Sequence, residues 1–318
     1  MKILVVGGAG YIGSMLCPVL LEHGYEVKVM DLLWFGNHLP AEVPVEKRNL
    51  FECKKQDFEG YEQVVFLAGL SNDPMAEYAP AQNFIQNAAL PAYLAFTAKA
   101  AGVKRFIYAS TCSVYGYTFN KLYDEEASVS CGFPYGISKL QGERGVHQMQ
   151  DAQFSVISLR QGTVCGHSPR MRMDLIVNTM FKCALTEGQI TINNPSLWRP
   201  IVFIKDTVKA FLRAIQAAHG ISGVFNIASG NYTVGQVGDL VKDEVERLTG
   251  KKIRLKVLNK QDLRNYKVTC EKAKTELGFQ PEYDLKEIVR DLHEHLPLYG
   301  DFSNEYFYNI QICKKLNL

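Results

Sequence analysis

Tyr135 and Lys139 are four positions apart in a segment, residues 134–150, whose pattern predicts a helix. Side chains at positions i and i+4 lie on one face of a helix, so the phenol and the ammonium group are expected to be neighbours. A free tyrosine has a pKa of about 10 and is a poor base at neutral pH. Because a nearby lysine cation lowers that pKa, the pair predicts a base that takes a proton from a substrate hydroxyl. The same spacing also occurs by chance on ordinary helices.

Hydroxyl groups that follow a predicted strand support the catalytic interpretation. The run at residues 110–116 comes directly after a segment that is expected to form a buried strand. Ligands of doubly wound sheets bind beyond the carboxyl ends of the strands. The hydroxyl of Thr111 is therefore expected to bridge the substrate and Tyr135. We predict that Thr111, Tyr135 and Lys139 are the catalytic residues.

Three glycines, Gly7, Gly10 and Gly13, separate a short apolar run from a helical pattern at residues 11–22. Such a turn lets the backbone approach a pyrophosphate at the N-terminus of the helix. Asp31 follows the next apolar run, where a carboxylate hydrogen-bonds the adenosine ribose and repels a 2′-phosphate. We therefore predict a dinucleotide site that prefers NAD to NADP.

Strand and helix patterns alternate over the first half of the chain. This alternation is typical of an α/β fold with a parallel, doubly wound sheet. We predict a Rossmann NAD-binding domain at residues 1–162, to which residues 200–228 return. A smaller C-terminal substrate-binding lobe is expected at residues 163–318.

These motifs together resemble the extended short-chain dehydrogenase/reductases that modify nucleotide sugars, which form an NAD-dependent epimerase/dehydratase family. The resemblance is to UDP-glucose 4-epimerase-like members and to NDP-heptose 4-dehydrogenase-like members. Its residues are Gly7-Gly8-Ala9-Gly10-Tyr11-Ile12-Gly13, Asp31, Leu67-Ala68-Gly69, Ser110 to Gly116, Tyr135 to Lys139 and Arg199 to Asp206. The segment Gly166 to Leu175 resembles the heptose-pathway 4-dehydrogenases in particular.

The resemblance implies roles for two groups of residues beside the catalytic three. Cofactor contacts are implied for Gly7, Gly10, Tyr11, Ile12, Gly13, Asp31, Asn49, Leu50, Leu67, Ala68, Gly69, Asn87, Ser110, Tyr135 and Lys139. Substrate contacts are implied for Ser71, Thr111, Cys112, Ser113, Thr163, Arg170, Arg172, Asn178, Arg199 and Arg264. Arg199 and Arg264 match the family arginines that bind the nucleotide diphosphate. Thr163 stands where the galactose epimerases often have asparagine.

Several reactions share a first oxidation at C4 of the sugar. The family's 4,6-dehydratases have an Asp-Glu pair after the threonine, where this chain has Cys112 and Ser113, so dehydration is disfavoured. We predict an NAD-dependent nucleotide-sugar C4 epimerase, with a net NDP-sugar 4-dehydrogenase as the alternative. The intact triad disfavours a non-catalytic NAD sensor. Arg199 and Arg264 disfavour a short-chain L-threonine dehydrogenase, because a small amino acid has no diphosphate.

Composition limits the partners. The 318 residues carry a net charge of +2 and no basic stripe, so we expect no nucleic-acid partner. The eight cysteines form no C-x-x-C pair, and we predict buried thiols in a reduced compartment and no metal site. The uncharged stretch at residues 3–21 contains too many glycines for a signal peptide or a membrane span. We expect a cytoplasmic protein without membrane contact, and the resemblance implies a homodimer.

Overall fold

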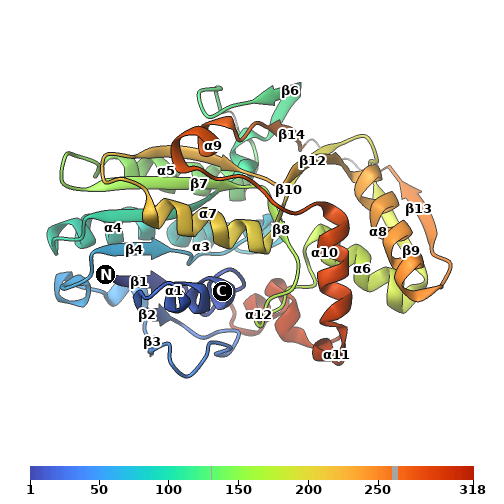
Figure 1. The fold of residues 1–318 in the computed structure, drawn as a ribbon, viewed down its shortest axis with the longest axis horizontal. Coiled ribbons are helices and arrows are strands. Elements are labelled where there is room, and N and C mark those ends of the chain that lie inside the picture. Colours follow the sequence, from blue (N-terminus) through green and yellow to red (C-terminus); the bar gives the residue numbers. More distant parts are fainter. Residues whose placement is uncertain (130, 260–263) are drawn as a thin grey trace.

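The computed structural model describes residues 1–129, 131–259 and 264–318. Its largest element is a seven-stranded parallel sheet with the strand order β11-β7-β5-β4-β1-β2-β3 (Figure 1). These strands are β1 (Lys2–Val6), β2 (Glu26–Asp31), β3 (Val45–Lys47), β4 (Gln63–Phe66), β5 (Arg105–Thr111), β7 (Ser155–Gln161) and β11 (Gly223–Ile227). The order reverses at β1, which has β2 on one side and β4 on the other. The predicted doubly wound α/β fold is confirmed.

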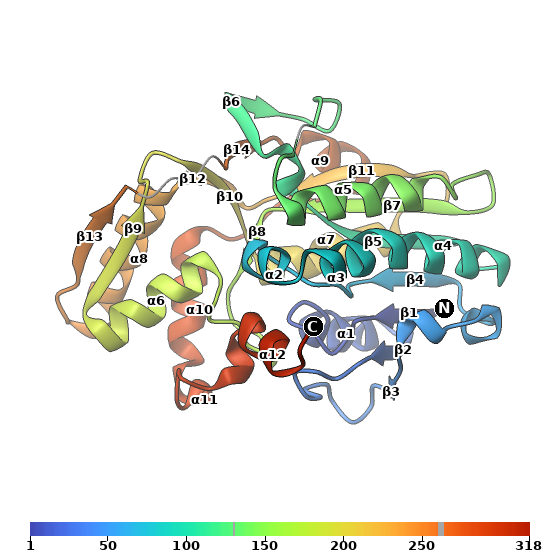
Figure 2. The same cartoon turned by 180° about the vertical axis from the view of Figure 1, so that it is seen from behind.

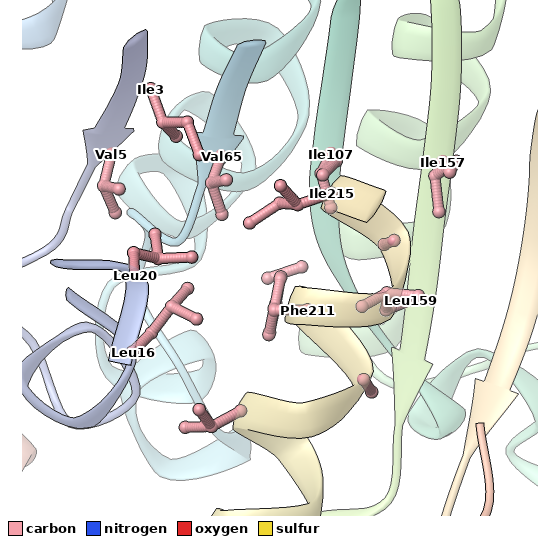
Figure 3. Close-up of a cluster of buried hydrophobic side chains, with 14 of the residues drawn as sticks. Ile3, Val5, Leu16, Leu20, Val65, Ile107, Ile157, Leu159, Phe211 and Ile215 are labelled. Atoms are coloured by element: carbon pink, nitrogen blue, oxygen red, sulfur yellow. The ribbon is translucent and has the colours of Figure 1, made fainter. Parts of the chain in front are cut away.

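Helices cover both faces of this sheet. Ile3 and Val5 of β1 belong to a buried cluster with α1 and α7 (Figure 3). Leu4 and Val6 alternate to the opposite face and pack in a cluster with α4 and α5. The helices are α1 (Gly13–Glu22), α7 (Ile204–Gln216), α4 (Leu90–Ala100) and α5 (Pro134–His147). Burial on both faces explains the continuous apolar run in β1.

The helical segment between β4 and β5 is interrupted. It consists of α3 (Pro80–Phe84), a π-helical turn (Ile85–Ala89) and α4, and α2 (Asp73–Tyr78) precedes it. A single π turn inside a helix frequently marks a functional site.

A second, smaller lobe packs beside the carboxyl ends of the sheet (Figure 2). Its helices are α6 (Ile176–Glu187), α8 (Val234–Thr249), α10 (Leu285–Glu294) and α11 (Leu296–Tyr299), with the strand pair β9 (Gln189–Asn193) and β13 (Arg254–Leu258). A three-stranded sheet joins the lobes and consists of β8 (Thr163–Cys165), β10 (Trp198–Phe203) and β12 (Gly230–Thr233). The pair β6 (Tyr117–Tyr123) and β14 (Asn265–Val268) lies at the edge of the first lobe.

The chain crosses between the lobes more than once. After β8 and α6 it returns through α7, which contacts α1, and through β11, which extends the seven-stranded sheet. β10 belongs instead to the three-stranded sheet. The last helix, α12 (Asn309–Lys315), lies between the second lobe and the first and contacts α2. In the described ranges, no helix has the length and apolar character that crossing a membrane requires.

Candidate active site

A deep cleft runs along the carboxyl ends of the parallel strands, between the two lobes. Its main compartment contains Tyr135 and Lys139. A smaller compartment beside it contains Asp31 and Asn49. The main compartment extends from Gly7 and Gly10 of the glycine turn to Arg199 and Arg264.

The glycine turn forms the floor where the two compartments meet. Gly7 has a φ of +76° and packs so closely that a Cβ there would collide with the backbone of Ala68. A Cβ at Gly13 would collide with the carbonyl group of Gly8. A Cβ at Gly10 would lie only 3.3 Å from the carbonyl oxygen of Gly7, and Gly10 lines both compartments. The N-terminus of the ten-residue helix α1 thus has a cradle of the kind that binds phosphate groups.

Asp31 ends β2 at the rim of the smaller compartment. Its Oδ2 accepts a hydrogen bond of 3.0 Å from the backbone N–H of Ala9, and its Oδ1 accepts one of 2.8 Å from that of Leu33. Burial raises the pKa of Asp31, and the two backbone donors oppose that effect. Both oxygens are held in place, as recognition of a ribose hydroxyl requires. Asn49 and Leu50 line the same compartment.

The three predicted catalytic residues come together in the main compartment. Thr111 ends β5, and Tyr135 and Lys139 lie on α5. The Thr111 hydroxyl donates to Oγ of Ser113 at 3.2 Å, and that oxygen lies 3.2 Å from the hydroxyl of Tyr266. The Lys139 ammonium lies 4.6 Å from the centroid of the Tyr108 ring. The cleft thus places a phenol, two aliphatic hydroxyls and a buried ammonium together.

The protonation equilibria of Tyr135 and Lys139 differ from the sequence expectation in one respect. Burial raises the pKa of Tyr135, while the charge of Arg172 and a hydrogen bond with Thr111 lower it. Burial lowers the pKa of Lys139 to about 7, and the neighbouring Glu143 opposes that shift. Within the chain itself, Arg172 is thus the leading influence that favours the Tyr135 phenolate. The sequence prediction named Lys139 in this role.

The π turn brings Asn87 against the catalytic helix. Asn87 Nδ2 donates to the carbonyl of Leu70 at 2.8 Å and to Oγ of Ser138 at 3.2 Å. The Ser138 hydroxyl in turn donates to the carbonyl of Tyr135 at 2.8 Å. The backbone of α5 approaches closely, because a Cβ at Gly142 would collide with the carbonyl of Asn87. The turn therefore fixes the position of α5 at the catalytic end.

A buried ion pair between α5 and β7 lies next to the catalytic residues. Arg160 of β7 donates through Nε to Oε2 of Glu143 at 3.0 Å and through Nη2 to Oε1 at 2.7 Å. The Ser110 hydroxyl also donates to Oε2 of Glu143, at 2.6 Å. Glu143 lies one helical turn after Lys139 on α5. The pair thus connects β5, β7 and α5 directly beneath the catalytic residues.

Four arginines line the side of the cleft that faces the second lobe. Arg172 forms a two-pronged ion pair with Asp174, at 2.9 and 3.1 Å, and donates to Oγ of Ser71 at 2.9 Å. Arg199 donates to the carbonyl of Arg264 at 2.5 Å, and Arg264 forms an ion pair with Asp73. The fourth is Arg170. Planar forks of donors on one wall suit a ligand with phosphate groups.

Most of the predicted site residues line one of the two compartments. In the main compartment are Gly7, Gly10, Tyr11, Ile12, Gly13, Leu67, Ala68, Gly69, Ser71, Asn87, Ser110, Thr111, Ser113, Tyr135, Lys139, Thr163, Arg170, Arg172, Arg199 and Arg264. In the smaller compartment are Asp31, Asn49 and Leu50. The structure thereby brings together residues from β1, α1, β2, β5, α5 and the second lobe.

Two predicted substrate contacts lie outside the cleft that the described residues form. Cys112 is fully buried and donates to the carbonyl of Arg160 at 3.0 Å. Asn178 is fully buried on α6, where it accepts from the N–H of Gly166 and donates to the carbonyl of Arg172 at 2.7 Å. Both side chains point into the core and not into the cleft, and the substrate contacts that the resemblance implies for them stay predictions.

Several lining residues escaped the sequence analysis. They include Phe35, Asn72, Asp73, Gln161, Leu175 and Asn309. The sequence could have predicted a cleft position for Asp73, because Asp73 lies two positions after the predicted substrate contact Ser71. Asn309 carried none, since nothing in the sequence predicts that the C-terminal segment folds back to the cleft.

The residues present fit a dinucleotide. The cradle over Gly10 suits a diphosphate and the held carboxylate of Asp31 suits a ribose. In the described part of the chain, Asn87 Oδ1 and Gln161 Oε1 are buried without a hydrogen-bond partner, and both residues line the main compartment. Buried polar atoms without partners are costly, so they indicate where a polar ligand binds. Among the described residues, no group of three or more His, Cys, Asp or Glu side chains could hold a metal.

Comparison with known proteins agrees with this geometry. The model of the NAD dependent epimerase/dehydratase family matches residues 3–228. A UDP-glucose 4-epimerase of Corynebacterium glutamicum is 28% identical over 327 residues, covering 96% of this chain and 98% of that protein. The solved UDP-glucose 4-epimerase of Thermotoga maritima with UDP-glucose is 27% identical, with a TM-score of 0.83 over 95% of this chain and 100% of that one. MoeE5 in complex with UDP-glucuronic acid and NAD is 25% identical, with a TM-score of 0.82 over 94% and 99%. The chain therefore belongs to the NAD-dependent epimerase/dehydratase family, and it is an enzyme that uses NAD.

Proposed function

We propose that the enzyme inverts C4 of a nucleoside-diphosphate sugar by transient oxidation at that carbon. One observation carries the proposal: Thr111, Tyr135 and Lys139 share a cleft with Arg199 and Arg264. The first three supply acid–base chemistry at a hydroxyl group, and the two arginines suit a diphosphate. The matched relatives include UDP-glucose 4-epimerases, and we extend their nucleotide, UDP, to this chain.

The mechanism assigns each residue a physical task. Bound NAD supplies the hydride acceptor. The Tyr135 oxygen would accept the proton of the C4 hydroxyl as that carbon is oxidised and return it as the carbon is reduced. Thr111 would hold the C4 oxygen beside Tyr135, and Lys139 would hold the cofactor ribose and add positive charge. Arg199 and Arg264 retain the diphosphate while the oxidised sugar turns its other face to the cofactor.

The described residues disfavour dehydration. A 4,6-dehydratase needs an acid and a base after the threonine, and Cys112 is buried away from the cleft. Ser113 does line the cleft, but its hydroxyl is not a carboxylic acid. Net 4-dehydrogenation is the alternative, because the segment Gly166 to Leu175 resembles such enzymes and Arg170 and Arg172 within it line the cleft.

The test is a panel of UDP-, dTDP- and GDP-linked hexoses, incubated with enzyme and analysed for C4 epimers by NMR. We expect interconversion of a UDP-sugar pair without added oxidant. Tyr135→Phe is expected to lower turnover about 10²–10⁴-fold while NAD remains bound. Tyr306→Phe is the matched control, because Tyr306 is 42% exposed and lines neither compartment of the cleft that the described residues form. Turnover by Tyr135→Phe near that of the wild type would refute the assignment of the base.

We also propose that the enzyme is a homodimer. Phe84, Ile85, Tyr93 and Phe96 are 40–59% exposed along α3, the π turn and α4, which gives a second copy an apolar surface. Sedimentation velocity is expected to show a dimer that Phe96→Glu dissociates. Leu298→Glu is the control, because Leu298 is 70% exposed on α11. A monomeric wild type would contradict the proposal.

The lobe assignment is also proposed. Residues 1–162 with 200–228 would bind NAD, and residues 163–318 would bind the sugar nucleotide. The contacts of α7 and β11 with the large sheet support the return of the chain. The boundary between the lobes at residue 200 falls within β10, which belongs to the three-stranded sheet and not to the large sheet.

A further inference from the structure

Arg170 is a buried cation whose hydrogen-bonding capacity is mostly unused. Only 3% of the residue is exposed, and it lies in the cleft wall between β8 and α6. Among the described residues, its side chain donates one hydrogen bond, from Nη2 to Oδ1 of Asn309 at 2.5 Å. Its Nε is buried without a partner in the same part of the chain. A guanidinium has five N–H donors, so a ligand with several acceptor oxygens would satisfy donors that the described residues leave without partners.

The loop that carries Arg170 is fixed against the glycine turn. The hydroxyl of Tyr11 donates to the carbonyl of Gly166 at 2.6 Å. The hydroxyl of Ser168 donates to the carbonyl of Tyr11 at 2.7 Å. Two buried hydrogen bonds therefore connect this loop of the second lobe to the turn that precedes α1. They hold Arg170 close to the phosphate cradle.

Arg170 lies where the two compartments of the cleft meet. Its guanidinium carbon is 3.7 Å from the centroid of the Phe35 ring. Phe35 lines both compartments, as do Gly7 and Gly10 of the glycine turn. One compartment contains Asp31 and the other the catalytic residues, so each suits one nucleoside of the dinucleotide. The diphosphate that joins the two nucleosides must pass this junction.

We propose that Arg170 binds the diphosphate of NAD, on the side opposite the glycine turn. The N-terminus of α1 supplies backbone N–H groups from one side, and Arg170 supplies a planar fork of charged donors from the other. This assigns Arg170 to the cofactor, whereas the sequence resemblance implied a substrate contact. Arg199 and Arg264 remain the candidates for the substrate diphosphate.

The charges around Arg170 agree with an anion at this position. Burial, followed by the neighbouring Arg172, lowers the pKa of Arg170 to about 9, while Asp174 and Asp31 oppose that shift. Asp174 already forms its ion pair with Arg172, and Asp31 accepts from two backbone N–H groups. A bound diphosphate would therefore stabilise the charged form of Arg170.

The C-terminal helix holds Arg170 in this position. Asn309, on the first turn of α12, accepts from Arg170 and donates through Nδ2 to Oγ of Ser71 at 3.0 Å. Cys313 of the same helix packs with Leu70 and Met75 of the first lobe. The helix thus spans the cleft and orients the cation from behind. We infer that α12 helps to retain the cofactor. This role rests on the proposed epimerase function, because NADH must stay bound until the hydride returns to the sugar.

Binding measurements test the assignment without any turnover. Calorimetry on cofactor-depleted enzyme would compare NAD, ADP-ribose, adenosine and UDP, for wild type, Arg170→Gln and Arg170→Lys. We expect Arg170→Gln to weaken NAD and ADP-ribose about 10- to 150-fold, the range for a hydrogen bond to a charged group. Adenosine and UDP should change less than about 3-fold. Arg170→Lys should recover part of the loss, because it keeps the charge and lacks the fork.

A second variant tests the helix separately. Asn309→Ala should accelerate release of NADH about 10-fold in a fluorescence chase with excess NAD. Gln311→Ala is the control, because Gln311 is exposed on the same helix. If Arg170→Gln fails to fold, the same ligand panel measured on Arg170→Lys decides the assignment of Arg170, because lysine keeps the charge and lacks the fork.

The outcomes distinguish the inference from the proposed function. Loss of UDP affinity with unchanged ADP-ribose affinity in Arg170→Gln would return Arg170 to the substrate and overturn the inference. Unchanged NADH release in Asn309→Ala would overturn the role of α12. If the ligand affinities change as expected but no sugar is epimerised, the proposed reaction fails while the assignment of Arg170 stands.

Discussion

Glu143→Gln is expected to destabilise the fold strongly, because it breaks a buried ion pair from one side. The side chains of Glu143 and Arg160 are only 4% and 6% exposed, and two hydrogen bonds of 2.7 and 3.0 Å join them. Removing one partner of a buried pair leaves an uncompensated charge, at a cost of about 3–5 kcal/mol. Ser110 also loses its charged acceptor, so the strand end beside Thr111 loosens as well. Urea denaturation followed by circular dichroism measures the free energy of unfolding.

Two further variants show whether the charge itself is the cause. The double variant Glu143→Gln, Arg160→Met should be more stable than Glu143→Gln alone, because no buried charge is left without a partner. Asp151→Asn breaks the ion pair between Asp151 and Lys99, whose side chains are 47% and 35% exposed, and should change the stability far less because solvent screens that pair. If Glu143→Gln costs no more than Asp151→Asn, the reasoning about this network is wrong.

Three other perturbations test separate parts of the site. Asp31→Ala should weaken the binding of NAD and raise the relative affinity for NADP, both measured by calorimetry. A carboxylate about 4 Å from a phosphate charge repels it by roughly 4 kcal/mol at a dielectric constant of about 20. Equal affinities of the wild type for the two cofactors would contradict this prediction. Arg264→Ala should weaken UDP roughly 10- to 150-fold and leave NAD unchanged, by the same method. Burial lowers the pKa of Lys139 to about 7, below its value of about 10.5 in the unfolded chain. The free-energy cost of burying the lysine charge is therefore largest below pH 7, and it decreases as the pH rises toward 10.5. Lys139→Met should therefore stabilise the cofactor-free protein against urea more at pH 6 than at pH 9, and an equal gain at both pH values would refute the buried charge.

The sequence predicted the first lobe well because its signals are local. Gly7, Gly10 and Gly13 need a tight turn, and the alternating apolar runs need a sheet buried on both faces. Those requirements come from neighbouring residues, so a pattern within one segment reveals them. The position of Thr111 at the end of β5 followed from the same logic, since parallel strands present their carboxyl ends at one edge.

The sequence could not predict the direction of a side chain where that direction depends on distant parts of the chain. Cys112 begins the short 3-10 turn Cys112–Tyr115 that follows β5, and its thiol enters the core. Asn178 falls on the inner side of α6 because the loop after β8 needs its amide. The π turn at Asn87 depends on the close approach of α5, and Asn309 reaches the cleft only because the C-terminal segment folds back. Pairings of this kind are set by tertiary packing and leave no periodic signal.

The central claim is that hydride leaves C4 and returns to the same carbon within one binding event. The direct measurement uses a UDP-hexose deuterated at C4, incubated with the enzyme and no external electron acceptor, followed by NMR and mass spectrometry of the product. The account predicts the C4 epimer with deuterium retained at C4 and no accumulation of free NADH. A 4-keto sugar that forms only with an added oxidant, with deuterium lost from C4, would contradict it.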